Sequence, residues 1–321
     1  MAAEDWRPTA GLAALQRRAL LMARLRDFFA ARGVLEVDTP LLAAAAASDP
    51  QIASFSVQDS RGRMAGFLQT SPEYAMKRLL AAGSGDIYQV CRAFRAEECG
   101  RHHDREFTLV EWYRLGLDLP GMMAETADLA AGLLGDGRET GFISYAQAFQ
   151  RHLHCDPLTA SIVHLRELAR DQGLDPATVP TLTRDDLLDF LVATCVGPEL
   201  GHGSLTCLHS YPASQAALAR LDPQDPRVAQ RFELYADGVE LANGFVELGD
   251  AGEQAARFAA DRLERQRRGL PVHAADARLL AALASGMPDC AGVALGFDRL
   301  VMLAAGAARI DEVMAFSGTR A

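Results

Sequence analysis

The segment Arg231-Phe-Glu-Leu-Tyr-Ala-Asp-Gly-Val-Glu-Leu-Ala-Asn243 decides the fold class of this chain. Apolar and polar residues largely alternate on both sides of Asp237-Gly238, which is the pattern of two half-buried strands. An Asp-Gly pair between such runs is a strong short-range signal for a tight hairpin turn. The segment therefore predicts an antiparallel β-hairpin.

The rest of the chain is consistent with a mixed α+β fold. Hairpins and loops, rather than a regular alternation of strands and helices, join the predicted elements, which favours an antiparallel sheet flanked by helices. We find no internal repeat and no linker rich in Pro, Gly and Ser, so we expect one domain over residues 1–321. Strands are predicted at 34–37, 66–70, 86–94, 106–115 and 292–295, and helices at 11–33, 71–83, 252–268, 274–285, after 296 and over most of 119–223.

Composition excludes several classes of protein. Of the 321 residues, 49% are hydrophobic and 23% are charged, which rules out a disordered or low-complexity chain. The formal net charge of −10 argues against broad nucleic-acid binding. No apolar run approaches the roughly 18 residues of a membrane span, and no secretory signal is evident. Six scattered cysteines without a C-x-x-C pair indicate reduced thiols, so we expect a soluble cytoplasmic protein.

Charged residues are densest between Arg92 and Tyr113. The guanidinium of Arg95 is suited to phosphate, because it donates two parallel hydrogen bonds and stays charged. If the strands continue, Arg95 shares a face with Glu97, and Glu111 shares a face with Tyr113. A solvated hairpin with surface ion pairs is the alternative interpretation.

Two further clusters could carry chemistry. Glu233, Glu240 and Glu247 surround the predicted hairpin and could hold Mg²⁺ or a substrate ammonium group, although three ordinary surface acids would give the same pattern. Arg299 begins the helix after the strand at 292–295, where a helix terminus favours phosphate. Cys99 with His102 and His103 has no second pair of ligands, which argues against a zinc site.

Taken in order, these blocks resemble class II aminoacyl-tRNA synthetases of the lysyl branch. The resemblance rests on residues 33–40, 94–111 and 292–299, which look like motifs 1, 2 and 3 of that class, and on 71–73 and 240–247. It implies the antiparallel class II catalytic fold. Because motif 1 forms the dimer interface in the family, it also implies a homodimer.

The first motif lies within the first forty residues, which leaves no room for the anticodon-binding OB domain of lysyl-tRNA synthetases. The chain thus resembles the stand-alone ligases of this family that attach (R)-β-lysine to elongation factor P. Ala294, where lysyl-tRNA synthetases usually have Gly, agrees with that resemblance. It implies that ATP and Mg²⁺ activate (R)-β-lysine or lysine as an adenylate, and that a lysine side chain of elongation factor P, rather than tRNA, accepts it.

The resemblance also implies roles for individual residues. Arg95 and Arg299 are the expected catalytic residues, and Glu233 and Glu240 the expected Mg²⁺ ligands. The ATP contacts are expected at Arg95, Ala96, Glu97, His103, Asp104, Phe107, Glu240, Leu241, Gly296 and Arg299. The amino-acid contacts are expected at Ser71, Pro72, Glu73, Glu111, Tyr113, Asn243, Glu247 and Ala294. One departure is Asp104-Arg105, where the family usually has Asn-Pro, and it puts the nucleotide contact at 104 in doubt.

Two other functions stay open at this point. A truncated synthetase-like enzyme would acylate tRNA or a small molecule, but the acidic net charge counts against tRNA. A catalytically inactive regulator would typically have lost Arg95, Arg299 or the acidic cluster, and all of these are present.

Overall fold

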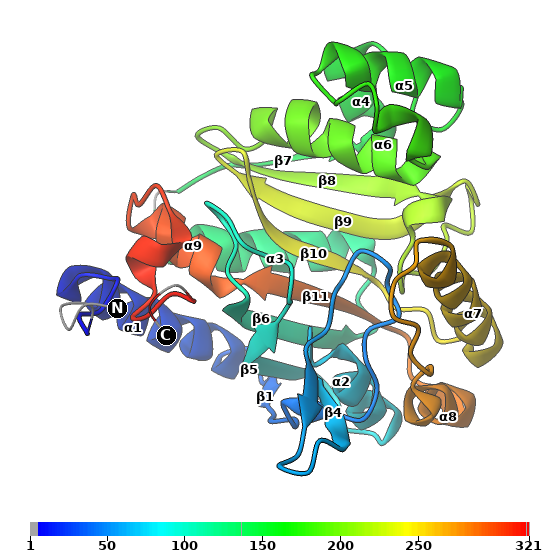
Figure 1. The fold of residues 1–321 in the computed structure, drawn as a ribbon. Helices are drawn as coiled ribbons and strands as arrows, with labels where there is room; N and C mark the ends of the chain where they lie inside the picture. Colours follow the sequence, from blue (N-terminus) through cyan, green and yellow to red (C-terminus); the bar gives the residue numbers. More distant parts are fainter. Residues whose placement is uncertain (1–5, 136, 319, 321) are drawn as a thin grey trace. The chain divides into compact units, whose positions relative to one another are not determined.

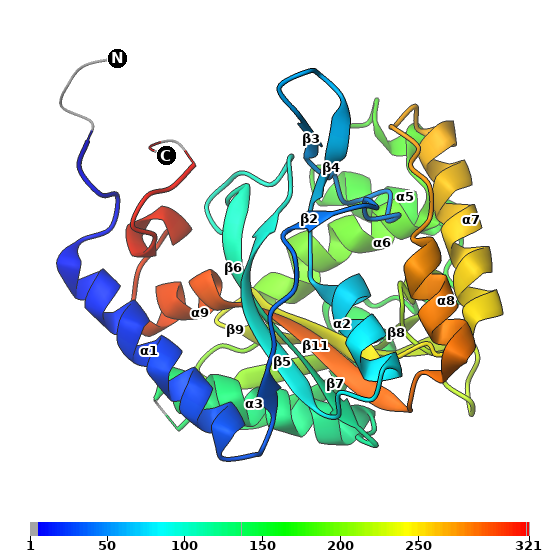
Figure 2. The ribbon, with the colours of Figure 1, turned by 90° about the horizontal axis from the view of Figure 1, so that it is seen from below.

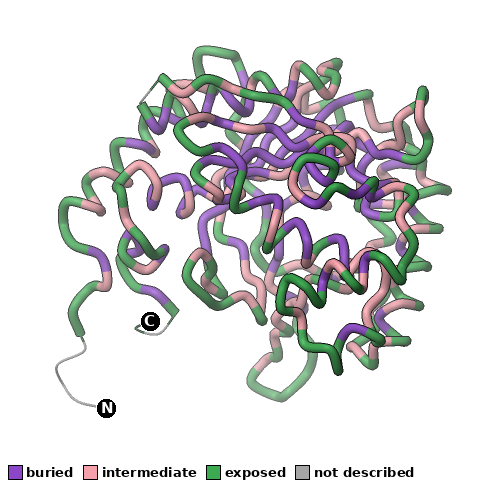
Figure 3. The backbone as a smooth tube through the Cα atoms, turned by 90° about the horizontal axis from the view of Figure 1, so that it is seen from above, coloured by how far each residue is buried: buried purple, intermediate pink, exposed green. Residues whose placement is uncertain are grey.

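The computed structural model describes residues 6–135, 137–318 and 320, and these residues form two compact units. The first unit lies within residues 1–117, 132–135 and 248–321, and the second within 118–131 and 136–247. Buried residues follow the strands, whereas exposed residues lie mainly at turns and along the outer sides of helices (Figure 3).

The first unit holds an ordered set of four sheet strands, β1-β5-β6-β11 (Figures 1 and 2). β1 pairs parallel with β5, and the β5–β6 and β6–β11 pairs are antiparallel. These strands span Leu35–Glu36, Ile87–Phe94, Glu106–Leu115 and Cys290–Gly296, and a small antiparallel sheet is made of β2 (Leu42–Ala43), β3 (Ser56–Gln58) and β4 (Met64–Leu68).

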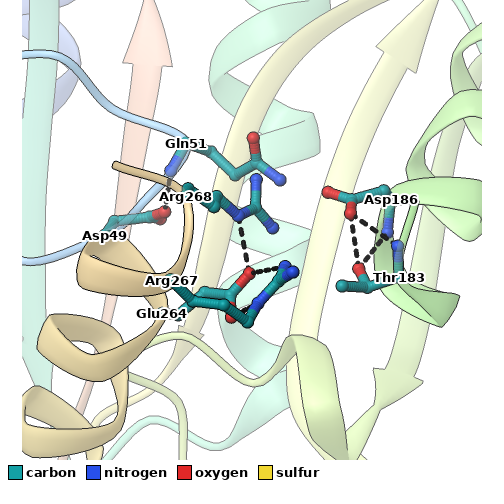
Figure 4. Close-up of polar contacts among 7 residues, drawn as sticks. All are labelled: Asp49, Gln51, Thr183, Asp186, Glu264, Arg267 and Arg268. Carbon is teal, nitrogen blue, oxygen red and sulfur yellow. Dashed lines mark hydrogen bonds and ion pairs between the residues drawn. The ribbon is translucent and has the colours of Figure 1, made fainter. Parts of the chain in front are cut away.

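The α-helices of this unit within the described residues are α1 (Leu12–Ala30), α2 (Glu73–Ala81), α7 (Ala251–Arg267), α8 (Ala277–Gly286) and α9 (Phe297–Ala304). α1 buries one stripe, because Leu21, Leu25 and Phe29 recur four residues apart. Gly33 lies beyond its end with φ +66°, a left-handed conformation that favours glycine. Near the end of α7, Glu264 accepts hydrogen bonds from Arg267 and Arg268, which neutralise its charge (Figure 4).

The second unit holds the strands β10-β9-β8-β7, which span Val239–Val246, Val228–Ala236, Leu205–Pro212 and Thr140–Ser144. Its helices are α4 (Tyr145–Leu153), α5 (Ile162–Asp171), α6 (Arg184–Leu191) and most of α3 (Leu119–Leu134). α6 begins with a capping box, because the side chains of Thr183 and Asp186 each accept a backbone N–H from the other residue (Figure 4).

The predicted hairpin is confirmed. Asp237 and Gly238 both have positive φ, +48° and +74°, as the tight turn between β9 and β10 requires. A side chain at Gly238 would also meet the Pro198 carbonyl oxygen at 2.8 Å, so this position admits only glycine without a shift.

The expectation that residues 119–223 are mostly helical is wrong in part, because β7 and β8 lie within it. β8 lies between β7 and β9 and buries Leu205, Cys207, Leu208 and Tyr211. Adjacent residues of this strand are buried, so it lacks the alternation that marks a half-exposed strand. Among the described residues, no helix is both long and apolar enough to cross a membrane.

Candidate active site

The predicted site residues fall in both units, and we call those of the first unit the first half and those of the second unit the second half. The first half is built on the start of α2, on β5, β6 and β11, and on the first residues of α9. The second half is built on the β9–β10 hairpin.

The first half contains a buried carboxylate, that of Glu111 on β6, which is 3% exposed. It accepts hydrogen bonds from the Ser71 hydroxyl and the Tyr113 hydroxyl, both at 2.6 Å. Tyr113 shares the face of β6 with Glu111, as the two-residue spacing predicts. Ser71 precedes α2 and also accepts the backbone N–H of Glu73 at 3.0 Å.

The environment of Glu111 changes its acidity. Burial, and next to it the charge of Glu73, raises the pKa of Glu111 to about 7, although the bonds from Ser71 and Tyr113 act in the opposite direction. Glu73 forms an ion pair with Lys77, whose ammonium lies 2.7 Å from Glu73 Oε1. Two carboxylates and one internal ammonium group thus leave this cluster suited to a cationic ligand.

Lys77 is the only lysine of the chain, and it is 1% exposed. Sequence analysis does not assign it to the site. The sequence does contain a signal for the Glu73–Lys77 ion pair. Lys77 follows Glu73 by four residues on a helix that begins at Glu73, and residues with this spacing lie on one face of a helix.

Arg95 follows the last residue of β5. The strand ends at Phe94, so the expected shared face of Arg95 and Glu97 is wrong; Arg95 instead pairs with Glu98 at 2.8 Å, and Glu97 is exposed. The Arg95 guanidinium lies 5.1 Å from the centre of the Phe107 ring. This places a cation and an aromatic face next to each other, a combination that suits a nucleotide.

Arg299 is the third residue of α9, at the N-terminal end where the helix dipole is positive. Its Nε donates to the His102 carbonyl at 3.1 Å, and its Nη2 contacts His103 Nε2. Gly296 is the N-cap of α9 in extended conformation. The expected arginine of motif 3 therefore meets the motif 2 loop.

Asp298 fixes the start of α9. One carboxylate oxygen accepts the backbone N–H of Thr108 at 2.6 Å, and the other accepts Nη1 of Arg18 from α1. Arg18 also donates to the Thr108 hydroxyl at 2.6 Å. These contacts tie α9 to β6 and α1, beside Phe107 and Arg299, and sequence analysis missed them because the partners lie far apart in the chain.

The remaining predicted residues of the first half make packing or backbone contacts within the protein. Ala294 packs against Ala93, Phe107 and Leu109, and the backbone N–H of Ala96 donates to the Ala53 carbonyl at 2.8 Å. Pro72 is the N-cap residue of α2. Asp104 accepts a backbone N–H from Gly318 at 2.9 Å.

In the second half, Glu233 on β9 and Asn243 on β10 are cross-strand partners. Arg231 connects them: its Nη2 donates to Glu233 Oε1 at 2.7 Å, and its Nε donates to Asn243 Oδ1 at 3.2 Å. The Tyr235 hydroxyl donates to the other Glu233 oxygen at 2.7 Å. Sequence analysis did not assign Arg231, although its spacing of two from Glu233 places both on one face of the strand.

Glu233 and Glu247 are not surface acids, whereas Glu240 is half-buried. Glu233 is 8% exposed and Glu247 is 1% exposed. Burial, and next to it the charge of Glu240, raises the pKa of Glu233, while Arg231 opposes this shift. Leu241 is buried on β10. Among residues 6–135, 137–318 and 320, no group of three or more His, Cys, Asp or Glu side chains is arranged to hold a metal ion.

The sequence is similar along its length to known proteins. The family described as tRNA synthetases class II (D, K and N) matches residues 4–320. The chain is 49% identical over 321 residues to the elongation factor P–(R)-β-lysine ligase of Salmonella paratyphi B, covering 98% of each chain. It is also 49% identical over 320 residues to the ligase of the same name from Salmonella dublin, again covering 98% of each chain.

Proposed function

We propose, since this chain belongs to the family of class II tRNA synthetases (D, K and N), that it is an ATP-dependent ligase that activates (R)-β-lysine and attaches it to a lysine side chain of elongation factor P. The observation that carries this proposal is the end-to-end similarity to proteins named for that reaction, which covers 98% of each chain. It agrees with the predicted fold class and the predicted resemblance.

The reaction has two steps. In the first, the carboxylate of the amino acid attacks the α-phosphorus of ATP, the bond to the β-phosphate breaks, and pyrophosphate leaves. In the second, the neutral amine of the acceptor lysine attacks the activated carbonyl, AMP leaves, and the amine loses a proton. Both steps depend on holding anions together and stabilising charge on phosphate oxygens.

For the first step we assign Arg95 and Arg299 to the phosphates. Arg95 provides a planar fork beside Phe107, whose ring we assign to the adenine, and Arg299 lies in the positive field at the start of α9. The other ATP contacts are proposed at Ala96, Glu97, His103, Glu240, Leu241 and Gly296.

For the amino acid we assign the pocket of Glu111, Tyr113, Ser71 and Glu73. A buried carboxylate with two hydroxyl donors is stabilised further by a substrate ammonium group, and a substrate without that amine leaves the acid without a partner. Pro72, Asn243, Glu247 and Ala294 are proposed to complete the amino-acid site.

Mg²⁺ is proposed to bind with ATP at Glu233 and Glu240. The residues fit a divalent cation, because burial and then the charge of Glu240 raise the pKa of Glu233, and a cation bound between the two carboxylates would relieve their repulsion. When bound, the ion neutralises phosphate charge. Arg231 holds the carboxylate of Glu233 in place.

The wider organisation is proposed as follows. Residues 1–321 act as one catalytic domain, the enzyme is a cytoplasmic homodimer, and the acceptor is the protein rather than tRNA. Leu12 and Leu20 of α1 and Leu35 of β1 are 71%, 44% and 56% exposed, which supports an interface formed by α1 and the motif 1 strand that follows it. The net charge of −10 supports the absence of tRNA binding.

ATP–pyrophosphate exchange tests the first step. Purified protein with Mg²⁺ is assayed in parallel with (R)-β-lysine, (S)-β-lysine and α-lysine, and we expect the fastest exchange with (R)-β-lysine. Mass spectrometry of elongation factor P after incubation then tests the transfer. Exchange without transfer to the protein would favour another acceptor, and no exchange with any isomer would overturn the proposal.

A matched pair of variants tests the assignment of Arg95. Arg95→Lys keeps the charge but loses the fork, and we expect exchange to fall by about tenfold or more. Arg92→Lys, on β5 shortly before Arg95, alters an exposed pair with Glu106 at 3.5 Å and should leave exchange unchanged.

A further inference from the structure

The loop between β5 and β6, residues 95–105, lies against the C-terminal segment 308–318, which we call the C-terminal clasp. Figure 2 shows the clasp between the start of α1 and this loop. Arg101 Nε donates to the Ala308 carbonyl at 2.8 Å, and the Ile310 N–H donates to the Arg101 carbonyl at 2.9 Å. Further along the loop, the Gly318 N–H donates to Asp104 Oδ2 at 2.9 Å.

We infer that Asp104 is a positioning residue, which docks the motif 2 loop on the C-terminal clasp and thereby sets the ATP affinity, and that it is not a nucleotide contact. The inference rests on the proposed ATP-dependent activation. It replaces the role expected for Asp104 from the family resemblance.

The clasp is itself firmly held. Ile310, Val313, Met314 and Ser317 are all buried. The N–H groups of Thr9 and Ala10 donate to the Ala315 and Met314 carbonyls at 2.8 and 3.1 Å, which ties the clasp to the segment before α1. A loop residue that binds the clasp therefore binds a fixed support.

Both oxygens of the Asp104 carboxylate accept hydrogen bonds from the protein backbone. Oδ2 accepts the Gly318 N–H, and Oδ1 accepts the N–H of the next residue, Arg105, at 2.7 Å. A negative charge in this position also repels phosphate oxygens. Both facts favour a contact to the backbone over a contact to ATP.

Docking of Asp104 bears directly on the catalytic arginine. The carbonyl of the neighbouring residue His102 accepts a hydrogen bond from Arg299 Nε, and His103 Nε2 contacts Arg299 Nη2. The loop is closed at its base by the Arg95 N–H, which donates to the Arg105 carbonyl at 2.9 Å. Release of Asp104 from the clasp frees the segment that orients Arg299, so phosphate binding weakens while the chemistry of the bound complex changes less.

Gly318 offers a way to test the contact from the other side. A Cβ at Gly318 would lie 2.7 Å from Asp104 Oδ1, and its three nearest atoms all belong to the Asp104 side chain. The backbone of Gly318 does not have a positive φ, so alanine is tolerated by the chain itself. Gly318→Ala therefore displaces the Asp104 carboxylate without touching any nucleotide contact.

The experiment is a double-mutant cycle with Asp104→Ala and Gly318→Ala, read out as KM for ATP and kcat in pyrophosphate exchange. We expect each single variant to raise KM for ATP by about three- to tenfold, with a smaller change in kcat, as the loss of one hydrogen bond predicts. The double variant should be no worse than Asp104→Ala, because both changes remove one contact. Asp104→Asn, which keeps an acceptor oxygen, should recover most of the affinity.

Asp59→Ala is the matched control. Asp59 likewise accepts backbone N–H groups in an exposed turn, from Arg61 and Arg63 at 2.8 and 3.0 Å. It should leave KM for ATP unchanged. A wild-type KM in Gly318→Ala together with a raised KM in Asp104→Ala would overturn the inference and assign Asp104 to the nucleotide, and additive effects would do the same.

Hydrogen–deuterium exchange of the peptide 96–105 separates this inference from the proposed function. Asp104→Ala and Gly318→Ala should each speed exchange of this peptide in the absence of substrates. If the wild-type protein activates no lysine isomer, the proposed function fails, and this readout still decides whether Asp104 docks the loop: unchanged exchange in both variants would refute it.

Discussion

At the scale of single residues, Arg231 is the side chain on which the second half of the site depends. It donates to Glu233, to Asn243 and to the Gln215 carbonyl, the last at 2.7 Å, and its guanidinium lies 4.3 Å from the centre of the Tyr211 ring. Lysine cannot reproduce this fork. Arg231 therefore fixes both a proposed metal ligand and a proposed substrate contact.

We predict that Arg231→Lys lowers kcat/KM for pyrophosphate exchange by about ten- to a hundredfold, the loss expected for charge-assisted hydrogen bonds of about 1.5–3 kcal/mol. It should also raise the Mg²⁺ concentration needed for half-maximal rate, which a purely structural role would not change. Arg227→Lys is the control, since Arg227 pairs with Asp225 at the surface. An unaltered Mg²⁺ dependence in Arg231→Lys would contradict the positioning role.

The raised pKa of Glu111 predicts that the affinity for lysine depends on pH. Its pKa in the free protein is about 7, so at pH 6 the carboxyl is mostly protonated and attracts an ammonium group weakly. The affinity for lysine should therefore rise as the pH increases from 6 to 8, and binding at pH 7 should release protons. Isothermal titration calorimetry in buffers of different ionisation enthalpy measures both quantities.

The same shift affects stability in a defined direction. Because the folded pKa of Glu111 is raised above its ordinary value of 4.5, its contribution to stability is full below that value and is lost as the pH rises through about 7. Glu111→Gln should remove both dependences. A lysine affinity in the wild type that is flat between pH 6 and 8 would contradict the assignment.

At the scale of elements, α2 carries an ion pair that is part of its own packing. Lys77 is 1% exposed, and its partner Glu73 has 18% of its side chain exposed. We predict that Lys77→Met lowers the free energy of unfolding by about 2–3 kcal/mol. This is somewhat less than the loss expected for a fully buried pair, because the carboxylate of Glu73 remains partly solvated. Urea unfolding measures this, and Arg78→Met on the exposed side of α2 should change stability by less than about 0.5 kcal/mol.

The elements also show which parts of the fold could be predicted. β5, β6 and the β9–β10 hairpin were predictable to within one to three residues, because turn residues and apolar runs mark their ends. β8 was not predictable from alternation, because it lies between two strands and adjacent residues are buried. The strand predicted to end at Phe94 does end there, so Arg95 lies beyond it, and the shared strand face expected for Arg95 and Glu97 is wrong.

At the scale of the whole molecule, the ordered sequence motifs predict which residues belong to the site. They do not predict the hydrogen-bond partners that hold those residues in place. The bonds of Arg231 to Gln215 and of Asp298 to Arg18 join residues 16 and 280 positions apart, and no local pattern marks them. The fixed support of Asp104 is likewise 214 residues away in the chain. Spacing along a chain predicts which residue types share a strand or helix face, whereas contacts between distant elements require the fold.

The proposed homodimer is the property that belongs to the molecule as a whole. Burial of exposed apolar residues drives association of subunits, and α1 exposes Leu12 and Leu20 while it buries Leu21, Leu25 and Phe29 within its own unit. We predict a light-scattering mass of twice 34.6 kDa at micromolar concentration.

Leu20→Glu should shift this mass to that of one chain, because association would bury the new charge without a partner. Leu263→Glu on α7 is the matched control: Leu263 is 68% exposed, yet it lies on neither α1 nor the motif 1 strand, so the protein should remain a dimer. If Leu20→Glu remains dimeric while Leu263→Glu dissociates, the interface lies on α7 and the motif 1 assignment is wrong. A wild-type protein with the mass of a single chain would refute the homodimer itself.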